Sequence, residues 1–298
     1  MLDTVKLHDD FGVEIRGVDL RAVTRDHLFP DIRALFEAHS LLLFRGQDFD
    51  EDTHRALATL FGPIEDLRDA AEGAPIERAM VSNAMTAGAL VADKRLRLLD
   101  LKANFYWHTD STFLPVPAIS NVLAGYVIPS GGGATEIVST RIGWDRLSPA
   151  LKEQARGAVV RHRFTHSRRL VDEELAQLPI YTRYPEVLWR AVWRNPVNER
   201  DALFLGAHAG GIVGREDADG RALISALMDA VTGPEAIYAH AWRPGDVLIW
   251  DQRATMHRGT PWNYEEERTL ASFVSSAVEA DGIASVRPRQ IEPELELQ

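Results

Sequence analysis

The sequence predicts a mainly β protein with peripheral helices, an α+β organisation in one domain over 1–298. Three observations support this. From Phe105 onward the chain consists of short strand-like runs, interrupted by prolines at 115, 117 and 129 and by the glycines at 131–133. No internal repeat, low-complexity tract or linker divides the chain. With 45% hydrophobic and 26% charged residues, the composition is that of a globular protein able to bury a sizeable core.

The first hundred residues are assigned from local patterns. Alternating apolar and polar residues over 12–20 predict a half-buried strand, and apolar residues at helical spacing predict an amphipathic helix over 29–39. The apolar run 41–44 is typical of a buried strand. A helix is expected over 50–61, where an N-capping aspartate begins it and a Gly-Pro pair follows it. The stretch 70–103 has no clear period, and we expect a loop or lid there.

The second part of the chain is dominated by strands. Helices are expected at about 149–156 and 218–231, where apolar residues recur at helical spacing. The segments 246–251 and 255–257 are predicted to be two strands joined by a short turn. His162 and His166 are four residues apart, which on a helix would suggest a metal-binding pair, but the segment 159–165 resembles a strand more than a helix. We therefore expect surface or structural roles for these two histidines.

Composition and charge exclude several classes of protein. The chain has no cysteine, which excludes disulfide scaffolds, zinc ribbons, iron–sulfur clusters and cysteine nucleophiles, so that any metal must be held by histidine and carboxylate. Its net charge of −11 opposes broad binding to nucleic acid. No apolar stretch reaches the roughly 18 residues of a membrane span. We expect a cytoplasmic protein whose partner is a small molecule, not nucleic acid or a membrane.

A possible metal site begins at Trp107-His-Thr-Asp110. On a strand, residues two apart point to the same face, so His108 and Asp110 can present an imidazole nitrogen and a carboxylate oxygen to one ion. Such a pair supplies two of the three ligands of a facial triad, which leaves positions open on non-haem Fe(II). The pair His8 and Asp10 has the same spacing, but it lies in a polar segment with no third ligand in view.

The second half of the pattern lies far downstream. His257 follows the strand that contains Trp250 and Asp251, and Arg268 follows His257 by eleven residues. A sandwiched β architecture brings such distant strands together. The set can hold a metal ion and a dicarboxylate.

These residues resemble the signature of a known family. His108-x-Asp110, the glycines before Thr135, His257 and Arg268 are similar to the motifs of the taurine and phenoxyacetate dioxygenase family, whose members use Fe(II) and 2-oxoglutarate. The similarity covers nearly the whole chain. Stretches such as 41–47, 60–65, 206–208 and 243–246 resemble the phenoxyacetate-cleaving branch.

The resemblance implies a fold, a ligand set and a reaction. The core is expected to be a double-stranded β-helix, or jelly roll. His108, Asp110 and His257 would bind Fe(II), Arg268 would pair with the distal carboxylate of 2-oxoglutarate, and Thr135 would add a hydroxyl donor. O2 is the other cosubstrate, and succinate and CO2 are released. Relatives of this kind are often dimers or tetramers.

The substrate pocket departs from the family pattern. Sulfonate and phenoxy acid enzymes commonly carry a second arginine four residues after the first, and Ser272 occupies that position here. Either the substrate lacks an anionic group, or another cation such as Lys102, Arg183 or Arg253 reaches it. Asn104 matches a position that faces the substrate in relatives. We therefore take Asn104 and Ser272 as substrate-binding candidates.

Each candidate also has a purely structural interpretation. Thr135 is compatible with an ordinary strand residue, Arg268 with a solvated charge cluster beside Glu265–Glu267, and Asn104 with a turn or strand edge. The tryptophans at 107, 250 and 262 are expected in the core or in a pocket wall, and His208 is not assigned to the metal.

The predicted function is hydroxylation of a small organic substrate that is phenoxyalkanoate-like or related. In a cleaving enzyme, this hydroxylation leads to oxidative cleavage of the substrate. One alternative is a taurine, alkylsulfonate or sulfate-ester dioxygenase. Others are a cupin-like metal enzyme that does not use 2-oxoglutarate, and a non-catalytic relative that binds a metal or ligand.

Overall fold

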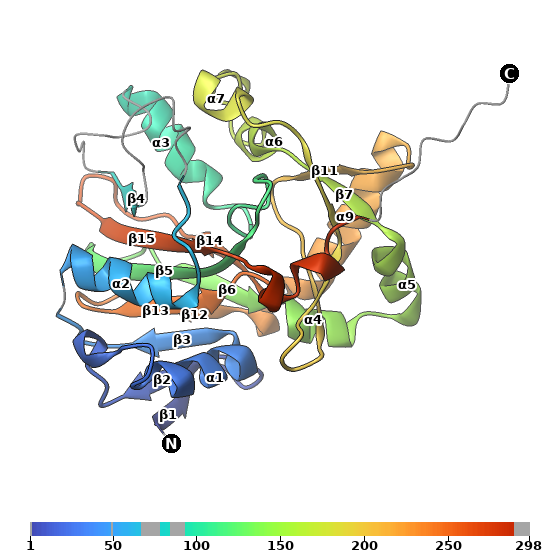
Figure 1. Ribbon diagram of the computed structural model, residues 1–298. Coiled ribbons are helices and arrows are strands. Elements are labelled where there is room, and N and C mark those ends of the chain that lie inside the picture. Colours follow the sequence, from blue (N-terminus) through green and yellow to red (C-terminus); the bar gives the residue numbers. More distant parts are fainter. Residues whose placement is uncertain (1, 49, 67–77, 84–92, 289–298) are drawn as a thin grey trace, which may run out of the picture.

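The computed structural model describes residues 2–48, 50–66, 78–83 and 93–288. Over these ranges the chain is a mixed structure in which β-sheets dominate and helices pack around them (Figure 1). No helix in this part of the chain is long and apolar enough to cross a membrane.

The largest sheet contains seven strands of the described chain, in the order β1-β2-β3-β13-β5-β15-β4. Its neighbouring strands are antiparallel except β2 and β3, which are parallel. The strands are β1 (Asp3–Lys6), β2 (Val13–Arg16), β3 (Leu41–Phe44), β13 (Val247–Asp251), β5 (Ala118–Val127), β15 (Thr269–Ser276) and β4 (Arg78–Ser82).

Three smaller sheets complete the β structure of the described residues. The sheet β12-β6-β14 carries one of the predicted metal ligands on β14. Its strands are β12 (Tyr238–His240), β6 (Thr135–Ser139) and β14 (Thr255–Gly259). The others are β11 (Ala209–Ile212), β7 (Val159–His162) and β8 (Val187–Arg190), and the pair β10 (Asp201–Leu203) and β9 (Val192–Arg194).

The N-terminal helices form where the local pattern predicts them. Helix α1 (Phe29–His39) and strand β3 have the predicted bounds, and α2 (Glu51–Phe61) begins where Asp50 accepts a hydrogen bond from Thr53 N over 2.9 Å. Their apolar faces pack on the large sheet, where each buried Leu, Ile or Phe side chain contributes roughly 1.5–3 kcal/mol. Helices α5 (Pro149–Gly157) and α9 (Asp217–Val231) also match the prediction.

Other helices differ from the expectation. The region after Phe105 contains four short helices that the sequence pattern did not predict, and the stretch 70–103 contains strand β4 and helix α3 (Lys94–Ala103). The rest of that stretch, 70–77 and 84–92, lies outside the described residues. The unpredicted helices are α4 (Thr140–Arg146), α6 (Phe164–Arg169), α7 (Glu173–Ala176) and α8 (Pro179–Thr182).

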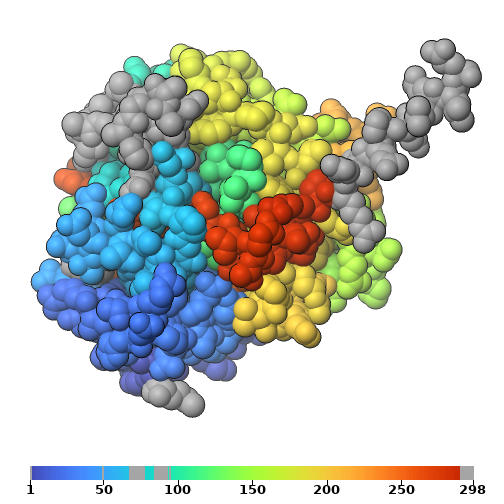
Figure 2. Space-filling model, viewed as in Figure 1, coloured from blue at the N-terminus to red at the C-terminus, as the bar shows by residue number. Residues whose placement is uncertain are grey.

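A C-terminal segment joins distant parts of the fold. In Figure 2 the red segment with η4 (Glu279–Asp281) and η5 (Ile283–Ser285) covers the surface between the blue N-terminal elements and the yellow ones. The Asp281 carboxylate pairs with Arg33 of α1 over 2.8 Å, and its carbonyl accepts a hydrogen bond from Trp193 Nε1 over 3.0 Å. The segment therefore ties α1 to β9. Two short 3₁₀ turns, η1 (Leu20–Ala22) and η3 (Pro234–Ala236), lie elsewhere.

Candidate metal and cosubstrate site

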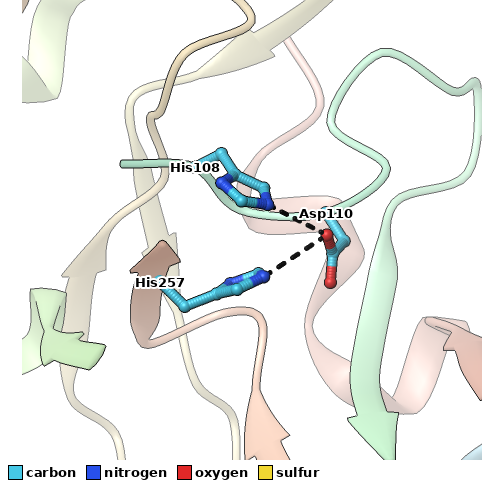
Figure 3. Close-up of side chains that lie close together, drawn as sticks. All are labelled: His108, Asp110 and His257. Atoms are coloured by element: carbon cyan, nitrogen blue, oxygen red, sulfur yellow. Dashed lines mark ion pairs between the residues drawn. The ribbon is translucent and has the colours of Figure 1, made fainter. Parts of the chain in front are cut away.

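Three side chains from two distant segments of the chain converge in Figure 3: His108 and Asp110 from one, and His257 from the other. One ligand atom of each lies within 4.8 Å of the other two. Asp110 Oδ1 is 3.6 Å from His108 Nε2 and 3.6 Å from His257 Nε2. Two imidazole nitrogens and one carboxylate oxygen directed at one point are the donor set of a facial triad.

A backbone bridge places the two histidines side by side. His108 N donates to His257 O over 3.0 Å, and His257 N donates to His108 O over 2.9 Å. The two-residue spacing had predicted a strand, but His108 forms only this isolated bridge and Asp110 begins a turn. Gly206 packs on the bridge with a φ of 152°, and a Cβ there would lie 2.9 Å from His108 Cα. Glycine is therefore required for this close approach.

Neighbouring groups orient the ligand atoms. His108 Nδ1 lies 2.8 Å from the Tyr106 carbonyl oxygen, so this nitrogen carries the proton and Nε2 keeps its lone pair. Asp110 Oδ2 accepts hydrogen bonds from Asn121 Nδ2, over 2.8 Å, and from Gln252 Nε2. Oδ1 is left to face the histidines. Partners of this kind are known to fix ligand orientation and to tune metal affinity.

The protonation states suit metal binding. Burial lowers the pKa of His257 to about 3 and also lowers the pKa of His108, so both imidazoles are neutral at pH 7. Burial opposes ionisation of Asp110, but the two histidines and the two amide donors lower its pKa below the ordinary value. The site therefore presents two neutral imidazoles and one carboxylate, which is the form that binds a divalent ion.

Arg268 lies in the same cavity, immediately before β15. The side chain is 4% exposed, so it does not belong to a solvated charge cluster. Its Nε and Nη2 both donate to the Gly133 carbonyl, over 3.1 and 2.9 Å, and its Cζ lies 5.0 Å from the Trp262 ring centroid. No carboxylate of the described residues pairs with it. Burial lowers the pKa of the guanidinium to about 10, so it stays charged at neutral pH.

Gly133 makes this position of Arg268 possible. Its φ is 66°, and a Cβ would lie 2.9 Å from Arg268 Nε. Within the glycine run at 131–133, Gly133 must therefore be glycine, because a side chain there would displace the Arg268 guanidinium.

The remaining candidates also line the cavity. Thr135, the first residue of β6, accepts a hydrogen bond at Oγ1 from Trp242 Nε1 over 2.9 Å, which leaves its hydroxyl proton to donate. Asn104 caps α3, and its carbonyl accepts from Gly259 N over 2.7 Å. Ser272 is 3% exposed, and its Oγ contacts Asn121 Oδ1 at 2.6 Å.

The cavity has a volume of about 370 Å³ and one strongly aromatic wall. Phe113 and Phe164 stack with their centroids 3.8 Å apart and their planes 7° apart. His208 contacts both rings edge-on and is not part of the metal-ligating group. Trp250 also lines the cavity, and its ring centroid lies 4.5 Å from that of His257.

None of the three cations named as possible replacements for an arginine at Ser272 lines the described cavity. Arg253 is 1% exposed and is held by Asp251 and Glu37, with Arg253 Nη2 2.6 Å from Glu37 Oε2. Lys102 and Arg183 are exposed, and neither is among the described residues that line the cavity. These three were offered as examples of one of two alternatives, because sequence position alone does not show which way a cation points.

Sequence reasoning missed several residues of the site. Asn121 and Gln252 hold Asp110, and Glu65 and Arg97 line the cavity. Glu65 ends the stretch 60–65, whose resemblance to the family could have identified it as a residue of the site. Asn121 lies within a strand and carries no local signal of its contact with Asp110.

A protein-family model described as "Taurine catabolism dioxygenase TauD, TfdA family" matches residues 3–273. The chain belongs to the TauD/TfdA family. This confirms the resemblance inferred from the ligand motif and Arg268, and it places the protein in a family of oxidoreductases.

Two TauD/TfdA relatives are named as dioxygenases that use alpha-ketoglutarate. The chain is 33% identical to the (S)-phenoxypropionate/alpha-ketoglutarate-dioxygenase of Sphingobium herbicidovorans, over 90% of this chain and 92% of that protein. It is 31% identical to the alpha-ketoglutarate-dependent 2,4-dichlorophenoxyacetate dioxygenase of Cupriavidus pinatubonensis, over 89% of this chain and 94% of that protein.

A solved TauD/TfdA-like structure, AAD-2 in complex with Mn(II) and N-oxalylglycine, superposes with a TM-score of 0.85. It is 29% identical, and the match covers 93% of this chain and 98% of AAD-2.

Proposed function

We propose that the protein is an Fe(II)- and 2-oxoglutarate-dependent dioxygenase that hydroxylates a small aromatic acid of the phenoxyalkanoate type. The observation that carries this proposal is one cavity that contains both the His108, Asp110 and His257 donor set and the buried Arg268. A triad of two neutral imidazoles and one carboxylate, together with a separate guanidinium, provides the two groups needed to hold a metal-chelating dicarboxylate at both ends.

The residues present fit a divalent metal. His108 and His257 would bind through Nε2 and Asp110 through Oδ1, since Nδ1 of His108 and Oδ2 of Asp110 are engaged by other partners. When bound, the iron centre together with 2-oxoglutarate and O2 supplies the oxidising power for C–H hydroxylation, with release of succinate and CO2.

The residues around Arg268 fit the cosubstrate. A buried guanidinium binds a carboxylate through two parallel charge-assisted hydrogen bonds, and the Thr135 hydroxyl can donate a further one. Trp262 covers one face of Arg268 and limits its contact with water. Arg268 and Thr135 thus orient the dicarboxylate and keep its distal end fixed.

The aromatic wall supports an aromatic substrate. The stacked Phe113 and Phe164 rings offer a flat apolar surface inside a cavity of about 370 Å³, a size that suits a small ligand. Asn104 can contribute a polar contact near this substrate. Phenoxyalkanoates are also the substrates named for the two similar enzymes.

We also infer a double-stranded β-helix core in a single domain. The seven-stranded sheet and the β12-β6-β14 sheet both contribute residues to the cavity, which supports two sheets that face each other. A cytoplasmic location, suggested by the sequence composition, and a homo-oligomer of two or four chains, suggested by family resemblance, are further parts of the proposal. Size-exclusion chromatography with light scattering tests the second.

A screen of 2-oxoglutarate-dependent succinate release tests the function. Phenoxyacetate and (S)-2-phenoxypropionate are compared with an alkylsulfonate, an alkyl sulfate ester and neutral phenyl ethers. We expect the phenoxy acids to be the best substrates, and the Asp110→Ala variant to be inactive. Anaerobic addition of Fe(II) and 2-oxoglutarate should give a metal-to-ligand charge-transfer absorption band. Absence of both signals would reject the proposal, and preference for the sulfur compounds would favour the alternative dioxygenase.

A further inference from the structure

Ser272 leaves one part of substrate recognition unexplained. Its hydroxyl donates to Asn121 Oδ1 over 2.6 Å, so its single proton is already used inside the protein. A neutral hydroxyl also cannot balance the charge of a buried carboxylate, which is costly to desolvate. An acidic substrate therefore needs a cation from elsewhere in the cavity.

Arg97 is placed to supply that cation. It lies on α3, which begins where Asp93 accepts a hydrogen bond from Leu96 N over 2.9 Å. Arg97 is 9% exposed and lines the cavity. Its Nη2 donates to the Ser82 carbonyl over 3.0 Å, and its Nε is buried without a partner within the described structure.

The other cavity arginines differ in their charge balance. Arg168 pairs with Asp100 over 2.9 Å and Arg78 pairs with Glu51, so carboxylates already balance both. Arg268 has no such partner among the described residues, and we assign it to 2-oxoglutarate. Arg97 is the other guanidinium of the cavity for which the described part of the chain provides no ion pair.

Two contacts hold Arg97 in place. Ser82 pairs with Thr269 in the β4–β15 ladder, so the carbonyl that accepts from Arg97 is fixed by the same strand that carries Ser272. Helix α3 is itself tied to α6 by the Arg168–Asp100 pair, and its Leu96 and Leu99 pack against the apolar cluster that contains Leu175 of α7. Both the helix that carries Arg97 and the carbonyl that Arg97 contacts are therefore held in place by neighbouring elements.

We propose that Arg97 binds the carboxylate of the substrate and selects for organic acids, in place of an arginine at position 272. The inference rests on the proposed function and names the residue that recognises the acid. The planar fork of the guanidinium matches a carboxylate, while the stacked Phe113 and Phe164 rings receive the aromatic part.

The test compares Arg97→Gln and Arg97→Lys with Arg95→Gln, a matched control on the same helix whose side chain is 61% exposed. Phenoxyacetate and its neutral amide are the probes. In Arg97→Gln we expect the KM for phenoxyacetate to rise at least tenfold, with little change for the amide or for 2-oxoglutarate. Arg97→Lys should recover part of the loss, and Arg95→Gln should match the unmodified protein.

Calorimetric binding of phenoxyacetate, with Mn(II) and 2-oxoglutarate under anaerobic conditions, separates this inference from the proposed function. Lost acid binding in Arg97→Gln without succinate release from any compound would reject the function and keep the inference. An unchanged KM for the acid, a rise in the KM for 2-oxoglutarate instead, or no acid binding by the unmodified protein would overturn the inference. If Arg97→Gln does not fold by circular dichroism, Arg97→Lys decides, because it keeps the charge but loses the fork.

Discussion

The hydroxyl of Ser272 donates to Asn121 Oδ1 over 2.6 Å, and the Nδ2 of the same amide donates to Asp110 Oδ2 over 2.8 Å. Ser272 is thus linked through Asn121 to the Asp110 carboxylate, the proposed metal ligand. The sequence predicted Ser272 to lie beside the substrate, and the structure shows that it also fixes the orientation of the Asn121 amide. The group that accepts the hydroxyl proton must be the amide oxygen, so the amide nitrogen faces Asp110.

Loss of the hydrogen bonds that link Ser272, Asn121 and Asp110 should weaken metal binding. Asn121→Ala is expected to lower the affinity for Mn(II) about 10- to 100-fold, the range found for groups that orient metal ligands, and Ser272→Ala should have a smaller effect in the same direction. Anaerobic calorimetry with Mn(II) measures both. Ser225→Ala, on the exposed face of α9, is the control. Equal affinities in all three variants would show that Asn121 does not orient Asp110.

Removal of a proposed ligand should abolish metal-dependent turnover. His108→Ala and Asp110→Ala each remove one of three donors, so we expect Fe(II)-dependent succinate formation to fall at least 100-fold. His8→Ala is the matched control, since His8 lies near Asp10 in the other motif of the same spacing, and its contacts with Asp10 N, Phe11 and the Glu235 carbonyl lie outside the cavity. Turnover that survives in both ligand variants would reject the site.

Arg268 should determine the requirement for 2-oxoglutarate. Replacement by methionine removes the charge but keeps much of the side-chain volume, and we expect the KM for 2-oxoglutarate to rise at least tenfold, as a lost charge-assisted pair implies. The KM for the aromatic substrate should change much less. Arg221→Gln, an exposed change on α9, is the control. An unaffected 2-oxoglutarate requirement would favour a metal enzyme that does not use this cosubstrate.

Glu65 should make the stability of the metal-free protein depend on pH. Burial raises the pKa of this carboxyl from 4.5 to about 7, so the folded protein keeps a proton that the unfolded chain has lost. Stability should therefore fall as pH rises from 4.5 to 7 and stay lowered above 7, by about 3 kcal/mol. Urea unfolding between pH 5 and 8 measures this.

The variant Glu65→Gln should flatten that dependence, because glutamine carries no titrating proton. Glu153→Gln, an exposed change on α5, should keep the slope of the unmodified protein. A slope that persists in Glu65→Gln would assign it to other groups.

The predictable parts of the fold are those with local causes. Helix α2 could be placed from the sequence because Asp50, which caps it, and the Gly-Pro pair that ends it are neighbours in the chain. Helices α7 and α8 have four residues each, too few to show a helical period, and were missed for that reason.

The residues of the site also fall into those that the sequence could predict and those that it could not. The donor residues could be named because their types and order resemble a family motif, although no regular strand carries His108 and Asp110. The groups that hold Asp110 could not be named, since Gln252 reaches it from 142 residues away. Arg97 was missed because only the packed position of α3 directs it into the cavity.

The backbone bridge between His108 and His257 also determines when a metal site can exist during synthesis. His108 and Asp110 leave the ribosome well before His257, and β5 emerges before both of its partners in the large sheet, β13 and β15. Until then, the nascent chain carries only two of the three proposed metal ligands, and the apolar strand β5 beside them lacks both β13 and β15. A metal ion at the proposed site can be bound by all three donors only after β14 has been translated. The long-range pairing of β5 also makes this region dependent on late events in folding.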